Sequence, residues 1–141
     1  MRVLLLCFLI ACGGASMQTI TLVNKTQRGI AEVFVYPANS PNHGASRGKL
    51  AAGASMTVQM KAGNVEVLAT SDTIQVDERT RDTMQAGATL QLNRPLQVVF
   101  HDSDQPPPDL GNKNVIGAAF KLLKPKTAEP EPDVTPAPPE N

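Results

Sequence analysis

Between Met17 and Asp102, apolar and polar residues alternate with a period of two in a series of short stretches. Successive side chains of a β-strand point to opposite faces, so this alternation predicts strands with one buried face. The predicted strands are 18–24, 30–36, 55–61, 65–70, 74–77, 89–93 and 96–101. Turn-forming residues separate them, which predicts an all-β fold, a small antiparallel β-sandwich of about seven strands.

Two of the predicted turns contain glycine. Residues 62–64 (Ala-Gly-Asn) predict a tight hairpin, and residues 86–88 (Ala-Gly-Ala) predict a turn before the next strand. Methionine side chains adapt to irregular gaps, so we expect Met56, Met60 and Met84 to fill spaces in the core.

One predicted connection, Ala38–Lys49, is long and rich in Asn, Ser, Gly and Pro. Loops longer than about 12 residues in compact domains tend to be functional. Four of its polar side chains could hold a partner or an anion, although a merely solvated loop is the plainer alternative. This candidate partner-binding loop consists of Asn42, His43, Arg47 and Lys49.

The segment 114–124 is compatible with two structures. As a helix it places Ile116, Ala119, Phe120 and Leu123 on one face, and Pro125 would end it. As a strand it places Ile116, Ala118, Phe120 and Leu122 on one face. The helix is the favoured alternative, although Gly117 costs such a helix about 1 kcal/mol.

Residues 125–141 hold six prolines and four acidic residues. A segment of this composition cannot bury enough apolar surface to fold, so we expect a disordered tail. A run of three prolines at 106–108 precedes it and predicts a stiff, extended spacer.

The N-terminus carries a targeting pattern. Arg2 precedes nine apolar residues, 3–11, a length that fits a signal peptide and falls far short of the ~20 residues that span a bilayer. The pattern ends in Leu9-Ile10-Ala11-Cys12, which resembles the lipobox of bacterial lipoprotein precursors. The alternative is an ordinary secretory signal peptide, cut near Ala15 or Ser16.

The lipobox resemblance implies cleavage between Ala11 and Cys12 and acylation of the Cys12 sulfur, with palmitate among the acyl chains. Two acyl chains already suffice for stable membrane attachment. Because Gly13 stands where an Asp would signal retention in the inner membrane, the resemblance further implies the outer membrane, with the domain facing the periplasm. Cys7 would leave with the signal peptide, so no intrachain disulfide could form.

A second, weaker resemblance covers residues 61–92. The patterns Gly63-x-Val65-x-Val67 and Ala86-Gly87-x-Thr89-x-x-Leu92 resemble small prealbumin-like or PEGA-like extracytoplasmic modules. This resemblance implies a non-catalytic β-sandwich fold.

Composition argues against several functions. Thirteen basic and thirteen acidic residues balance, and the chain has four Phe, one Tyr and no Trp. Nucleic-acid binding uses a basic surface and aromatic stacking, so no nucleic-acid partner is expected. Asn24-Lys25-Thr26 matches the N-glycosylation pattern, but a turn-favouring Asn explains it better.

Two chemical alternatives remain open. Thioethers suit Cu(I), so a periplasmic copper or other metal carrier could use His43, His101, Met56 and Met60. A small envelope hydrolase could combine Ser40, His101 and Asp102. Neither set has a specific motif, so we expect no enzyme activity, no metal site and no cofactor.

The sequence therefore predicts a lipid-anchored protein of the bacterial cell envelope. Its β-sandwich would act as a binding or scaffold module, with the bilayer and an envelope protein or peptidoglycan as partners. The expected segments are a signal peptide (1–11), the lipidated cysteine and tether (12–17), the β-sandwich (18–104), a spacer with an amphipathic segment (105–124) and the tail (125–141).

Overall fold

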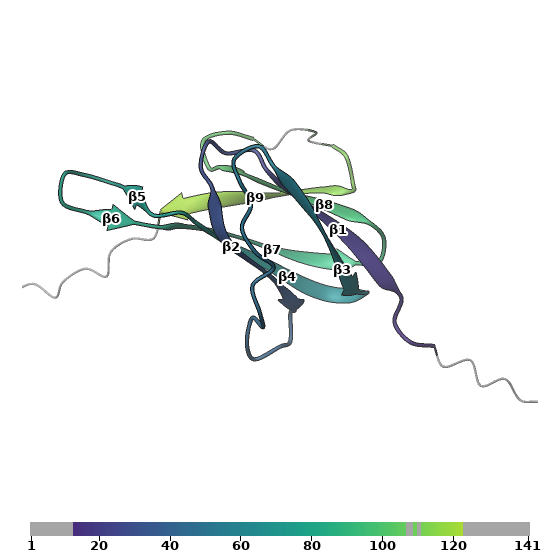
Figure 1. The fold of residues 1–141 in the computed structure, drawn as a ribbon. Coiled ribbons are helices and arrows are strands. Elements are labelled where there is room, and N and C mark those ends of the chain that lie inside the picture. Colours follow the sequence, from purple (N-terminus) through teal and green to yellow (C-terminus); the bar gives the residue numbers. More distant parts are fainter. Residues whose placement is uncertain (1–12, 107–108, 110, 123–141) are drawn as a thin grey trace, which may run out of the picture.

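The computed structural model describes residues 13–106, 109 and 111–122 (Figure 1). These residues form nine strands and no helix, so the all-β prediction is confirmed. The predicted signal peptide, Cys12, and the predicted tail at 125–141 lie outside the described residues.

Eight of the nine strands lie between Met17 and Asp102, and the ninth follows the proline-rich connection. The strands are β1 (Met17–Asn24), β2 (Ile30–Pro37), β3 (Ser55–Lys61), β4 (Gly63–Ser71), β5 (Ile74–Gln75), β6 (Arg81–Asp82), β7 (Met84–Leu92), β8 (Leu96–Asp102) and β9 (Val115–Leu122).

Seven strands form one mixed sheet in the order β2-β4-β7-β9-β8-β1-β3, while β5 and β6 form a separate two-stranded hairpin. The sheet curls until its edge strands β2 and β3 come into contact at a few residues, so it is nearly closed like a barrel. The expectation of a purely antiparallel arrangement is wrong, because β8 pairs in parallel with both β1 and β9. Alternation in the sequence identifies strands but carries no information on which strands become neighbours.

Both predicted glycine turns need correction. Residues 62–64 do turn the chain, but β3 and β4 on either side do not pair, so they form no hairpin. Residues 86–88 lie in the middle of β7, opposite Ala69, Leu68 and Val67. A Cβ at Gly87 would meet the Val67 carbonyl oxygen at 3.6 Å, an ordinary van der Waals contact, so this glycine is not required by a turn or by a close approach.

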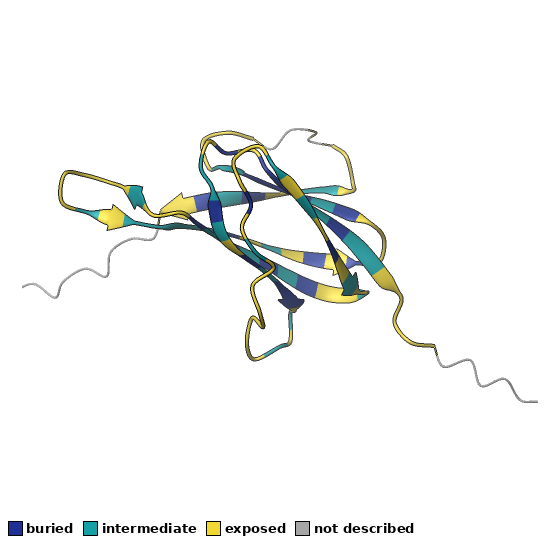
Figure 2. Cartoon of the chain, viewed as in Figure 1, coloured by how far each residue is buried: buried dark blue, intermediate teal, exposed yellow. Residues whose placement is uncertain are grey.

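The core lies inside the curl and takes the inward-facing side chains of every strand of the large sheet (Figure 2). Phe100 and Phe120 are its largest buried side chains, and their ring centroids lie 6.0 Å apart. Met56, Met60 and Met84 pack against the core while remaining partly buried, as the sequence predicts.

The C-terminal segment is a strand, so the favoured helix is wrong. β9 inserts between β8 and β7, and Ala118 and Phe120 are buried on one face, as the strand alternative requires. β9 pairs with β8 over 115–120 and buries Ala118 and Phe120, and this long-range pairing outweighs the preference for a helix that Gly117 already weakens. Leu122 departs from the strand pattern, because it is exposed.

The side chain of Asn24 joins three segments at the end of β1. Its Nδ2 donates to the carbonyl oxygens of Arg28 (2.7 Å), Leu50 (3.2 Å) and Ala51 (3.2 Å). Its Oδ1 accepts hydrogen bonds from the backbone N–H and the hydroxyl of Thr26, at 3.0 and 2.7 Å. Asn24 has no exposed surface, so in the folded domain this Asn-x-Thr sequence is a structural turn, inaccessible to glycosylation.

We expect Asn24→Asp to destabilise the domain by about 3 kcal/mol or more, because a carboxylate cannot donate to the buried carbonyl groups around it. Urea denaturation followed by circular dichroism measures this loss. Asn93→Ala is the control, since Asn93 is exposed in the turn before β8 and should change stability by less than about 0.5 kcal/mol. Equal losses in both variants would contradict the role given to the Asn24 amide.

Two neighbouring alanines distinguish the strand from the helix at 115–122. Ala118→Glu should cost about 3 kcal/mol or more, because it buries an unpaired carboxylate beside Phe100 and Phe120. Ala119→Glu should cost less than about 1 kcal/mol, because Ala119 is partly exposed on the other face. Thermal unfolding of both variants gives the comparison. A larger loss in Ala119→Glu than in Ala118→Glu would contradict the strand and favour the helix.

Candidate functional site

The long loop between β2 and β3 folds back along the outer edge of β2. The Ala38 N–H donates to the Asn64 carbonyl oxygen. This bond shows which residues of β2 direct their backbone groups toward β4. Because hydrogen-bonding direction alternates along an antiparallel strand, Val33, Val35 and Pro37 direct their backbone groups away from β4. The carbonyl groups of these three residues are the ones that the loop contacts.

Arg47 makes two of these contacts. Its N–H donates to the Val33 carbonyl oxygen at 2.7 Å, and its Nη2 donates to the Val35 carbonyl oxygen at 3.2 Å. The Ser40 N–H donates to the Pro37 carbonyl oxygen at 2.9 Å. Arg47, predicted as a partner-binding residue, therefore also caps an edge strand of its own domain.

Two hollows lie where β2 and β3 approach each other at the open side of the curl. The larger, of about 690 Å³, is bounded by the end of β2, the end of β3, the start of β4 and Met17. The smaller, of about 220 Å³, lies between β2 and the long loop. Pro37 and Met60 line both hollows, so we treat the two as one feature, the seam groove.

The larger hollow of the seam groove is mainly apolar, and the charged residues that line the groove are all basic. Among the described residues that line it, Lys61 and Arg47 are charged and none is Asp or Glu. Met17, at 56% exposure, offers an accessible apolar side chain at one end. This surface can therefore hold an apolar group with an anionic end.

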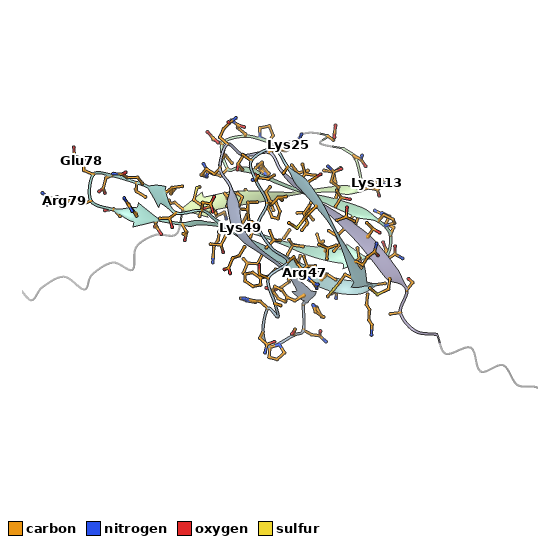
Figure 3. All side chains as sticks on the ribbon, in the orientation of Figure 1. Lys25, Arg47, Lys49, Glu78, Arg79 and Lys113 are labelled. Atoms are coloured by element: carbon orange, nitrogen blue, oxygen red, sulfur yellow. The ribbon has the colours of Figure 1, made fainter. Side chains whose placement is uncertain are left out.

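The structure brings three of the four predicted loop residues to the seam groove. Asn42, His43 and Arg47 line its smaller hollow, while Lys49 lies outside it, farther along β2 (Figure 3). The His43 ring packs 4.9 Å from the Tyr36 ring and 5.7 Å from the Phe34 ring. These contacts to β2 hold the loop in place as well as shaping the hollow.

Sequence reasoning missed Met17, Met60 and Lys61 as groove residues. Alternation in 55–61 places Met60 on the inward face, which is correct. Its position beside an open seam depends on β3 being an edge strand, and that follows from the pairing order alone.

Tyr36, which lines the smaller hollow, forms a cross-strand pair with Glu66. They lie opposite each other in β2 and β4. Burial first, and then the hydrogen bond and negative charge of Glu66, raise the pKa of the Tyr36 phenol above its ordinary value. Tyr36 is therefore a neutral hydrogen-bond donor at physiological pH.

The Tyr36 phenol is the chain's only one, so its titration can be followed by phenolate absorbance. We expect a midpoint above that of free tyrosine, and a lower midpoint in Glu66→Gln, which removes the charge but keeps an acceptor. Since the folded pKa is raised, this group's contribution to stability is complete below the unfolded pKa and is lost as pH rises through the folded pKa. An unchanged midpoint in Glu66→Gln would contradict the pairing.

The sets proposed for metal binding and hydrolysis are not assembled. His43 and Met60 share the smaller hollow, whereas His101 lies on β8 with its Nδ1 2.8 Å from the Asp102 carbonyl oxygen. In the part of the chain that the structure describes, no group of three His, Cys, Asp or Glu could hold a metal ion. The Ser40 hydroxyl donates to the Asn42 carbonyl oxygen rather than to a histidine.

Asp102, the proposed acid of that hydrolase, pairs instead with Arg28. The Arg28 guanidinium also lies over the Phe120 ring, 6.0 Å from its centroid. These two contacts connect the turn after β1 to β8 and β9, and they account for Asp102 structurally.

No model of a known protein family, no curated protein and no solved structure matches this chain. Within the described residues, no helix has the length and apolar character needed to cross a membrane.

Proposed function

We propose that this protein is a bacterial lipoprotein whose β-domain is a non-catalytic binding or scaffold module of the cell envelope. The observation that carries the proposal is the sequence Leu9-Ile10-Ala11-Cys12 at the end of an apolar segment of signal-peptide length. Acylated Cys12 would be the new N-terminus and the membrane anchor, in the outer membrane if the organism has one.

The start of the domain suits such an anchor. Residues 13–16 are exposed, and the glycines at 13 and 14 have no atoms nearby that a Cβ would meet. β1 begins at Met17, five residues beyond Cys12, so the anchor would hold the domain within about 17 Å of its lipid.

The orientation of the domain follows from this short tether. The Ala62 N–H donates to the Ser16 carbonyl oxygen at 2.8 Å, so the turn between β3 and β4 lies beside the point where the tether leaves. Met17 and Lys61 line the larger hollow at this same end. The tether would therefore keep this end of the seam groove close to the bilayer.

The seam groove is the surface that we propose for partner binding. It combines an apolar floor with two cationic side chains, Lys61 and Arg47. An envelope protein or peptidoglycan that presents a carboxylate beside an apolar group would match it. We further propose that the curled sheet acts as a β-sandwich, in which β2-β4-β7 face β3-β1-β8-β9 and present this groove rigidly.

Intact mass tests the anchor directly. Protein purified from bacterial membranes should have the mass of residues 12–141 plus acyl chains, and Cys12→Ser should lose this modification and the cleavage. Cys7→Ser is the matched control, because Cys7 lies in the segment that is removed, so its mature mass should equal that of the wild type. A soluble, unmodified chain that begins near Ser16 would refute the lipoprotein.

A further inference from the structure

The two edge strands of the sheet differ in how their backbone is protected. Exposed edge strands invite pairing with another chain, and proteins commonly guard them with proline, bulges or covering loops. β2 has all three: Pro37 ends it, a register shift interrupts it between Ile30 and Glu32, and the long loop, mainly through Arg47, covers its outward carbonyl groups. β3 has a regular register throughout and, among the described residues, pairs only with β1.

The phase of the β1–β3 pairing shows which backbone groups are free. Ala62 and Asn24 donate their N–H groups to the Ser16 and Ala54 carbonyl oxygens, respectively, at 2.8 and 2.9 Å. Hydrogen-bonding direction alternates along the strand, so the backbone groups of Met56, Val58 and Met60 bond to β1. The backbone groups of the alternate residues point away from β1. These residues are Ser55, Thr57, Gln59 and Lys61.

We propose that the outer edge of β3 pairs with the same edge of a second copy of this chain, antiparallel and centred on Val58. This register uses the whole strand and places outward-pointing residues opposite one another, Ser55 with Lys61 and Thr57 with Gln59. Each of these pairs occurs twice by symmetry, which gives four pairs, and each pair can exchange two backbone hydrogen bonds. The result is a two-fold symmetric dimer with a continuous sheet.

The side chains of β3 are self-complementary in this register. On the inward face, Met56 lies opposite Met60 and Val58 lies opposite Val58, so apolar groups meet apolar groups. Both methionines are only partly buried in one copy, and pairing would cover them further. On the outer face, polar residues meet polar residues.

The charges also permit this pairing. Lys61 is the one charged residue of β3, and it lies opposite Ser55. The two Lys61 side chains start about 20 Å apart along the strands, well beyond the ~8 Å Debye length at physiological ionic strength. A second copy is therefore an occupant that the strand accepts without repulsion.

The test is the mass of the full chain in detergent solution, measured by sedimentation equilibrium over a concentration series. Gln59→Pro removes one outward N–H from each copy but no hydrogen bond to β1, so it should weaken dimerisation by about tenfold or more. Gln59→Ala is the matched control, because both variants lose the side-chain bond to Thr19, and it should dimerise like the wild type. A monomeric wild type, or equal dimerisation of both variants, would overturn the proposal.

Cysteine cross-linking tests the register and does not depend on a proline variant folding. Mixed Thr57→Cys and Gln59→Cys chains should form a disulfide dimer, since paired Cα atoms lie about 5.5 Å apart. Either variant alone should give no more dimer than the wild type. Its two cysteines would lie diagonally across the strand pair, with their Cα atoms more than about 7 Å apart, too far for a disulfide. Absence of the mixed dimer, or equal yields from single variants, would overturn the pairing centred on Val58.

Discussion

The side-chain amide of Asn24 is the contact on which the rest of the domain depends. It lies where β1 ends, and its hydrogen bonds hold the following turn and the end of the long loop at Leu50 and Ala51. Leu50 in turn pairs with Ile30 at the start of β2. Since β1 lies beside β3 at one edge of the sheet and β2 forms the other, this buried amide links the two ends of the curl. An apolar core alone could not fix their relative position, because hydrophobic contacts are non-directional.

The sheet remains open between β2 and β3, and the two sides of this opening are unlike. The loop that Asn24 holds is bound along β2, where Arg47 and Ser40 donate hydrogen bonds to the outward carbonyl groups of Val33, Val35 and Pro37. Nothing comparable covers β3 among residues 13–106, 109 and 111–122. The seam groove and the free strand edge are therefore two consequences of one incomplete closure. Both belong to the surface on which we place the partners of this protein.

The sequence predicts the strands well because burial on one face produces period-two alternation, as in Ile20 and Leu22 of β1. It fails at β7, whose residues 86–88 it assigns to a turn, and at β9, where Ala118 and Ala119 are the same residue type and Phe120 fits both a helical and a strand face. Pairing with β8 decides the case of β9, and pairing is a long-range property. The loop residues Asn42, His43 and Arg47 were found through loop length, whereas Met60 and Lys61 were missed because their exposure depends on strand order.

The central claim is that this domain has one guarded sheet edge and one open edge. Amide hydrogen exchange followed by NMR, on dilute full-length chain, tests it most directly, because exchange reports the hydrogen bonding of each N–H. We predict alternation along β3, with slow exchange at Met56, Val58 and Met60 and fast exchange at Thr57 and Gln59. Raising the protein concentration should slow the fast pair. Uniformly slow exchange along β3 in dilute solution would mean that its outer edge is already occupied within one chain, and that would contradict the claim.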